Sequence, residues 1–330
     1  MAAADEVLRM LEARRGESVS GEEMAAALGL SRAAVWKAVS GLKERGFRIS
    51  AGTNRGYTLE SDGGCLHPET IRRHLRSAGE LRLRVYDEVR GSTNDLAREA
   101  AARGEAEGLA VIADSQTAGR GRQGRSFVSP PGTGVYLSLL LRPKLPAAEA
   151  VAVTGIAAVA AARAIGDMGG GSAGIKWVND LYLRGKKVCG ILTEAAMDME
   201  SGGLDYAVVG IGVNLFSPPG GFPPALAGIA GAVFPGEPRD DERSRFIAAL
   251  LDRFLPLYRA LPDRGWLEEY RSRSILIGRE VRFLREGAER RGLVLGVDDS
   301  ARLLLRLPDG GELALSSGEV QLIRPLEAEA

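Results

Sequence analysis

Apolar residues recur at helical spacing in short segments near the N-terminus. One predicted helix begins with a Ser-x-x-Glu capping box at Ser20. The next, at about 32–45, follows Ser31, a residue type that caps helix N-termini. Its predicted apolar face consists of Val35, Trp36, Val39 and Leu42. Two helices joined by a tight glycine-containing turn predict a helix-turn-helix at about 21–40.

Two short strands are predicted next, at 47–49 and 56–59. They flank Thr53-Asn54-Arg55, so this hairpin is interpreted as the wing of a winged helix-turn-helix. Residues 60–67 are polar and glycine-rich, which favours a linker.

Strand-length apolar runs then alternate with helical patterns. The predicted strands are 81–86, 109–114, 135–142, 175–183, 187–194 and 206–213, and the predicted longer helices are 151–168, 241–259 and 266–272. The helix at 151–168 has no polar face and should be buried. Its apolar part is about 15 residues long, below the roughly 20 needed to cross a bilayer, so no membrane association is expected.

From Ile277 onward the pattern changes to short strands with tight turns, which predicts a small SH3-like β-barrel. The expected fold class is therefore α+β, with a mixed sheet in the central domain. The predicted domain boundaries are 1–62 for the winged helix-turn-helix, 63–274 for a central ligand-binding domain and 275–330 for the barrel.

Composition narrows the class of protein. The 330 residues contain 43 Lys+Arg and 43 Asp+Glu, so a basic surface can only be local. Cys65 and Cys189 are the only cysteines, which argues against a disulfide framework and favours the cytoplasm. With two histidines besides, no side-chain metal site is predicted.

Positive charge is concentrated in the helix-turn-helix. Six basic residues and one acidic residue lie between Ser31 and Arg55. Because the second helix of such a motif enters the major groove, the predicted DNA-binding residues are Ser31, Arg32, Trp36, Lys37 and Arg55. A small helical interaction module without DNA is the alternative.

The segment Gly119–Arg125 alternates three glycines with three arginines between two predicted strands. Glycines allow close backbone approach, and guanidinium groups bind phosphate or carboxylate in a bidentate manner. The segment satisfies G-x-G-x-x-G, but Pro130-Pro131 and a strand follow instead of a helix, so a dinucleotide fold is not expected. We interpret it as an anion-binding loop; a solvated arginine-rich turn is the alternative.

Other polar residues gather at predicted strand ends. Half of the six lysines fall within residues 176–187, which suggests that an ammonium group is required there. The set also contains Ser92, Thr93, Asn94, Gln116, Asn179, Asp180, Gly190, Gly210, Gly212 and Asn214. Several cations with amides and one carboxylate suit a carboxylate substrate and a phosphorylated intermediate. In structural terms alone, Ser92 or Thr93 could cap a helix, Asn179-Asp180 could form a turn, and the glycines could permit close strand packing.

Over nearly its whole length the chain resembles bifunctional biotin–protein ligases that repress the biotin operon. The resemblance rests on the winged helix-turn-helix, Ser92-Thr93-Asn94, the Gly119–Arg125 loop, Lys176-Trp177-x-Asn179-Asp180, Lys187 with Gly190-Ile191-Leu192, and Gly212-x-Asn214. It implies that biotin and ATP, with Mg²⁺, form biotinyl-5′-AMP. The biotinyl group then passes to a lysine of biotin carboxyl carrier protein, the acceptor in acetyl-CoA carboxylase. A ligand-bound homodimer would bind operator DNA.

The resemblance also implies residue roles. Arg122, Lys187 and Asp180 would be catalytic, with Asp180 orienting or deprotonating the acceptor lysine. Biotin would be bound by Ser92, Thr93, Asn94, Gln116, Gly119, Arg120, Gly121, Arg122, Lys187, Gly190 and Gly210. The nucleotide would be bound by Arg120, Phe127, Lys176, Asn179 and Asn214.

Two positions depart from the family pattern. Val178 stands where the family usually has proline, and Phe127 stands where it usually has tryptophan. Phenylalanine offers a smaller face for stacking on adenine, so nucleotide affinity is the property that these changes affect. Two further functions remain open: a lipoate-type acyl ligase of the same fold, and a transcription factor that senses biotin without catalysis.

Overall fold

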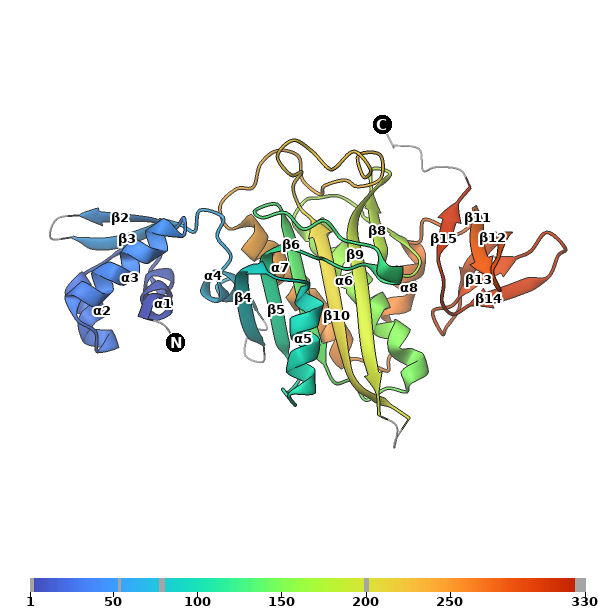
Figure 1. Ribbon diagram of the computed structural model, residues 1–330, viewed down its shortest axis with the longest axis horizontal. Helices are drawn as coiled ribbons and strands as arrows, with labels where there is room; N and C mark the ends of the chain where they lie inside the picture. Colours follow the sequence, from blue (N-terminus) through green and yellow to red (C-terminus); the bar gives the residue numbers. More distant parts are fainter. Residues whose placement is uncertain (1–2, 53–54, 77–80, 199–201, 324–330) are drawn as a thin grey trace.

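The computed structural model describes residues 3–52, 55–76, 81–198 and 202–323. Three sheets with their helices lie in a row along the long axis of the molecule, in chain order (Figure 1). The predicted α+β class is confirmed: an N-terminal helix-turn-helix, a central mixed sheet and a C-terminal antiparallel sheet.

The N-terminal unit contains the predicted helix-turn-helix. Its elements are α1 (Ala3–Ala13), β1 (Ser18–Val19), α2 (Gly21–Leu28), α3 (Arg32–Glu44), β2 (Arg48–Gly52) and β3 (Gly56–Ser61). The Ser20 hydroxyl accepts a hydrogen bond from the Glu23 amide, and Gly29 ends α2 with a φ of 64°. Ser31 caps α3 through the Ala34 amide. The short strand β1 was not predicted; it pairs with β3.

Trp36 corrects one prediction about α3. The buried residues of this helix are Val35, Ala38, Val39 and Leu42, whereas Trp36 is 62% exposed. Positions i, i+3, i+4 and i+7 already complete the stripe that faces the core, so the neighbouring position points to solvent.

The segment predicted as a linker is ordered where it meets β3. Glu60 and Ser61 belong to that strand, and Asp62 is fully buried. The Asp62 carboxylate accepts hydrogen bonds from the backbone amides of Gly64 and Asp241, at 2.9 and 3.0 Å. The predicted wing tip at Thr53 and Asn54 lies outside the described residues.

The central sheet has seven strands in the order β4-β5-β6-β10-β9-β8-β7. The bounds are β4 (Arg82–Val89), β5 (Leu109–Gln116), β6 (Gly134–Leu141), β7 (Gly174–Lys176), β8 (Asp180–Leu183), β9 (Lys186–Met197) and β10 (Leu204–Asn214). Among these described strands, β4 and β5 alone pair in parallel. The single strand predicted at 175–183 is wrong: the chain turns at Trp177–Asn179, so that β7 and β8 pair with each other and Lys176 lies opposite Asp180.

Helices cover the two faces of this sheet unequally. α5 (Thr93–Ala102) packs on one face, against Leu109, Val111, Leu140 and Val208. α6 (Ala150–Asp167) covers the other face, together with α7 (Glu242–Arg259) and α8 (Trp266–Ser272). Among the described helices, α6 alone is long and apolar enough to cross a membrane, yet 72% of it is buried inside the protein, as expected of a core helix.

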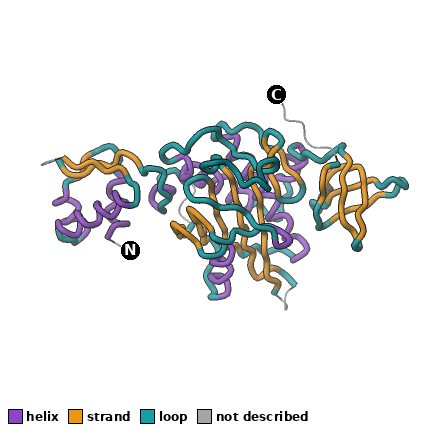
Figure 2. Tube along the Cα trace, turned by 45° about the horizontal axis from the view of Figure 1, so that its top comes forward, coloured by secondary structure: helices purple, strands orange, loops and turns teal. Residues whose placement is uncertain are grey.

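The remaining elements complete the chain. The short helix α4 (Pro68–Arg72) follows the N-terminal unit, and the 3-10 turns η2 (Arg122–Gly124) and η3 (Ala147–Glu149) lie in loops. The C-terminal sheet has the order β14-β13-β12-β11-β15. Its strands are β11 (Glu280–Arg285), β12 (Ala288–Val297), β13 (Leu303–Arg306), β14 (Glu312–Leu315) and β15 (Val320–Leu322). Long loops cross one end of the central sheet (Figure 2), and the candidate site lies beneath them.

Candidate active site

A cavity of about 650 Å³ lies on the face of the central sheet that α5 only partly covers. Strands β9 and β10 supply its floor, and the loop between β5 and β6 covers it. Phe222, Leu226, Ile229 and the turn before β15 complete the wall. A concave site that combines apolar side chains with converging polar groups is typical of a small-molecule site.

One end of the cavity is lined by a connected set of polar side chains at the start of α5. Ser92 caps this helix, and its backbone amide donates to Asp95. The structural role that the sequence offered for Ser92, a helix cap, is therefore present. The Thr93 hydroxyl donates to Gln116 Oε1 at 3.2 Å. The Ser138 hydroxyl lies 2.7 Å from Thr93 Oγ1 and 2.6 Å from Asn94 Oδ1. Ser92, Thr93, Asn94 and Ser138 are buried, and hydrogen bonds join Thr93, Asn94, Gln116 and Ser138, so this end of the site is preorganised.

Glycines without side chains form part of the floor of the cavity. Gly212 pairs with Gly190 across β10 and β9, and the Phe127 ring lies over both. A Cβ atom at Gly212 would lie 2.7 Å from this ring, and one at Gly210 would overlap the Asn94 amide. The glycines thus admit the side chains of Phe127 and Asn94 rather than a closely packed strand, and Gly190, Gly210 and Gly212 line the cavity.

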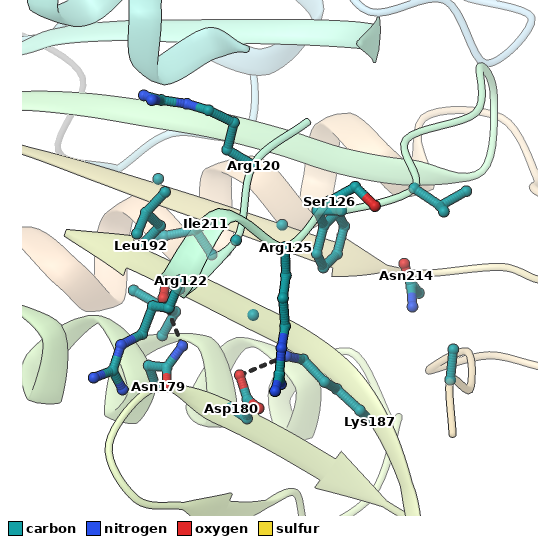
Figure 3. Close-up of a pocket in the computed structure, with 18 of the residues that line it drawn as sticks. Arg120, Arg122, Arg125, Ser126, Asn179, Asp180, Lys187, Leu192, Ile211 and Asn214 are labelled. Atoms are coloured by element: carbon teal, nitrogen blue, oxygen red, sulfur yellow. Dashed lines mark hydrogen bonds and ion pairs between the residues drawn. The ribbon is translucent and has the colours of Figure 1, made fainter. Parts of the chain in front are cut away.

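The three arginines of the Gly119–Arg125 loop reach different partners. Arg120 lies 2.7 Å from Glu194 and 3.0 Å from Asp95. Arg122 donates to Asn179 Oδ1 at 3.1 Å, and Arg125 lies 2.6 Å from Glu319. Figure 3 shows Arg120 directed away from Asp180 and Lys187, while Arg122 extends toward Asn179. The loop closes on itself through Gln123 and Gly124, which have φ values of 55° and 74°.

A charged pair lies at the other end of the cavity. Lys187 Nζ is 2.6 Å from Asp180 Oδ1, and both groups line the cavity (Figure 3). Lys176 lies near this pair, with its Nζ 5.9 Å from the centre of the Tyr182 ring. Burial lowers the pKa of Lys176, against the opposing effect of Asp180. The site thus combines two ammonium groups and one carboxylate at one place.

Two residues predicted to contact the nucleotide, Asn179 and Asn214, donate their side-chain amides to backbone carbonyls of the protein. The Asn179 amide donates to Ile191 O at 2.9 Å while its oxygen accepts from Arg122. The Asn214 amide donates to Gly231 O at 3.2 Å. All the residues predicted around biotin and nucleotide line this cavity except Gly119, whose missing side chain leaves room for the Phe127 carbonyl.

Sequence reasoning missed three contributors. Tyr182 faces Lys176, Glu319 binds the loop, and Glu194 binds both Asn94 and Arg120. Glu194 could have been found, because it lies four residues after Gly190 in one strand and so shares its face. Glu319 gave no such signal, since it lies in the turn before β15, far away in the sequence.

The predicted DNA-binding residues are exposed, at the start of α3 and in the wing. Ser31, Arg32, Trp36 and Lys37 are exposed, and Arg55 is exposed at the end of the wing. Arg45 and Arg48 instead form long ion pairs with Asp87 and Asp240, at 3.7 and 3.8 Å. Basic residues are therefore exposed both at the start of α3, at Arg32 and Lys37, and after its end, at Arg45 and Arg48.

Family models match three parts of the chain. They are an HTH domain at 4–58, the Biotin/lipoate A/B protein ligase family at 88–214, and the Biotin protein ligase C terminal domain at 276–323. Among known structures, a biotin protein ligase from Aquifex aeolicus in complex with biotin and ATP is similar with a TM-score of 0.60 and 27% identity. It covers 74% of this chain and 99% of its own.

Curated relatives match over most of the chain. A bifunctional ligase/repressor of Bacillus subtilis (strain 168), BirA, is 34% identical over 92% of this chain and 94% of its own length. The protein of the same name from Escherichia coli (strain K12) is 30% identical over 92% and 95%. The helix-turn-helix, the ligase sheet and the C-terminal sheet all fall within these matches. The chain therefore belongs to the family of bifunctional biotin ligases and repressors.

Proposed function

We propose that the protein activates biotin with ATP and transfers the biotinyl group to a lysine of a biotin carboxyl carrier protein. In the first step, a carboxylate oxygen of biotin attacks the α-phosphorus of ATP, and the bond to pyrophosphate breaks. In the second, the acceptor lysine attacks the acyl carbon of biotinyl-5′-AMP, and AMP leaves. The arrangement that best supports this proposal is the Lys187–Asp180 pair beside the glycine floor and the arginine loop.

The first step joins two anions, so its transition state needs positive charge. Lys187 and Arg122 supply fixed cations at the cavity, and Asn179 orients Arg122 by accepting its hydrogen bond. Lys176 adds a further cation on the nucleotide side. We propose that the loop over the cavity shields a reactive acyl-adenylate from water.

The second step requires that the acceptor ammonium lose a proton. Asp180 is the carboxylate that lines the cavity beside Lys187, which makes it the group proposed to orient and deprotonate the acceptor lysine.

We assign the biotin rings to the end of the cavity near α5, where Ser92, Thr93, Asn94 and Gln116 gather. The nucleotide would lie toward Phe127, Lys176 and Asn214. No group of three acidic, cysteine or histidine side chains suited to a metal occurs in the described parts of the chain. Mg²⁺ commonly keeps water and phosphate ligands, so it enters this proposal bound to ATP.

A transfer assay tests the proposed reaction. The purified protein is incubated with labelled biotin, ATP, Mg²⁺ and a biotin carboxyl carrier domain, and label on the carrier is measured. Lipoate replaces biotin in a parallel reaction. We expect transfer with biotin only. Absence of transfer would contradict the ligase proposal, and transfer of lipoate alone would favour the lipoate alternative.

The exposed start of α3 supports operator binding as the second function. Helix-turn-helix proteins place this part of the second helix in the major groove, and dimers occupy two half-sites. We therefore propose that biotinyl-5′-AMP favours a homodimer that binds operator DNA. The basic residues Arg32 and Lys37 meet the DNA, together with Arg55 of the wing.

Arg32→Glu is expected to weaken operator binding by about 30- to 100-fold at low salt, because a phosphate or base contact becomes a repulsion. The measurement is a titration of labelled operator DNA with the ligand-bound protein at two salt concentrations. Arg9→Glu, at an exposed position of α1, is the matched control and should leave affinity unchanged. Normal operator binding by Arg32→Glu would refute the assignment of this helix end to the groove.

A further inference from the structure

Glu194 lies outside the cavity but contacts two of the residues that line it. Asn94 and Arg120 line the cavity, whereas Glu194 does not. Its Oε2 atom accepts from Asn94 Nδ2 at 2.8 Å and from Arg120 at 2.7 Å. One carboxylate oxygen on β9 thus joins a side chain of α5 to the first arginine of the ligand loop.

These contacts belong to a balanced cluster of four charges. Asp95 Oδ1 lies 2.7 Å from Arg98 and 3.0 Å from Arg120. Arg98 also lies 3.6 Å from Glu194 Oε1. Two guanidinium groups therefore share two carboxylates, and loss of either carboxylate leaves one positive charge without compensation. Glu194 is the member that also reaches the biotin end of the site.

Glu194 also decides how the Asn94 amide is oriented. An amide side chain presents NH₂ on one side and oxygen on the other, while a carboxylate only accepts. Because Glu194 and Leu192 O both accept from Asn94 Nδ2, the Asn94 oxygen must point toward Ser138. Gly210 has no side chain at this place, so Asn94 fits directly against β10.

Building on the proposed ligase function, we propose that Glu194 is a positioning residue for biotin binding. It acts through Asn94, whose amide orientation it fixes, and through Arg120, by which it holds the start of the ligand loop against the sheet. In this arrangement Arg120 anchors the loop, while Arg122 and Lys187 supply the charge at the reacting atoms. Glu194 itself contacts no substrate.

Glu194→Gln is the sharpest test, since it keeps the size of the side chain, removes the charge and allows the Asn94 amide to turn over. Loss of charge-assisted hydrogen bonds predicts a rise of about tenfold in both the biotin Kd, measured by calorimetry, and the biotin KM of adenylation. The kcat should stay within about threefold of wild type, because the lost contacts act in binding rather than at the reacting atoms. Glu88→Gln makes the same change at an exposed position of β4 and should alter neither value.

A double-mutant cycle separates positioning from a general structural effect. If Glu194 acts through Arg120, then Glu194→Gln adds little to the biotin Kd of an Arg120→Gln variant. Fully additive effects would overturn the role of Arg120. An unchanged biotin Kd in Glu194→Gln, or a loss confined to kcat, would overturn the proposal as a whole.

Two further measurements keep the test decisive. If Glu194→Gln does not fold, Glu194→Asp retains the charge but is one methylene too short to hold both partners, so its biotin Kd should also rise. The calorimetric Kd requires no catalysis. Failure of the wild type to bind biotin would therefore defeat the proposed function, whereas equal binding by wild type and Glu194→Gln would defeat only this inference.

Discussion

Replacing Lys187 by methionine is expected to lower the rate of biotinyl-5′-AMP formation by about two to three orders of magnitude. The substitution removes a cation that lines the cavity and leaves Asp180 without the partner that now lies 2.6 Å away. The attack of a carboxylate on a phosphate would then proceed with one cation fewer beside Asp180, with Lys176 as the remaining ammonium group nearby, and repulsion between like charges raises its barrier. The measurement is pyrophosphate release from biotin and ATP under saturating conditions.

The neighbouring residue provides the control for this variant. Lys186 is exposed and donates to Ala227 O, outside the Lys187–Asp180 pair, so Lys186→Met should retain nearly full activity. Lys187→Arg keeps the charge but enlarges the head group beside Gly190, where an added Cβ would already lie 3.4 Å from the ammonium. We expect partial activity from it. A Lys187→Met protein within tenfold of wild type would show that another group neutralises the reacting anions.

Gly210→Ala is expected to weaken biotin binding about 50-fold, the equivalent of losing two hydrogen bonds that orient the ligand contact. The new Cβ would overlap Asn94 Oδ1 and lie 2.9 Å from Asn94 Cγ, so the amide must move. Its hydrogen bonds with Ser138 and Glu194, at 2.6 and 2.8 Å, would break together. Calorimetric titration with biotin gives the affinity.

Gly296→Ala is the matched control, because a Cβ there meets nothing within 4 Å and the residue also lies in a strand. It should bind biotin as the wild type does. Circular dichroism on both variants would separate loss of the site from loss of the fold. If Gly210→Ala bound biotin with wild-type affinity, Asn94 would not be a biotin contact, and the assignment of this end of the cavity would be wrong.

Local patterns in the sequence were sufficient for most elements of the fold. The helix-turn-helix followed from Ser20, Ser31 and Gly29, because caps and left-handed glycines act within a single turn. The buried helix α6 followed from its lack of a polar face, and the predicted strand pattern correctly gave β5, β6, β9 and β10. Where a pattern was ambiguous, prediction failed: Trp36 was assigned to the core, and the turn at Trp177–Asn179 was read as continuous strand.

The sequence by itself predicted most of the residues that line the cavity, because the glycine-arginine loop and the lysine cluster are local and chemically distinctive and the family resemblance added the others. Tertiary structure decided what each of them contacts. Asp180 turned out to be paired with Lys187 because β8 and β9 form a hairpin, and Arg120 to be held by Glu194 rather than directed at Lys187. Contacts such as Arg125 with Glu319 join residues almost two hundred positions apart. Because such partners are set by packing of whole sheets, and not by neighbouring residues, no local pattern in the chain could specify them.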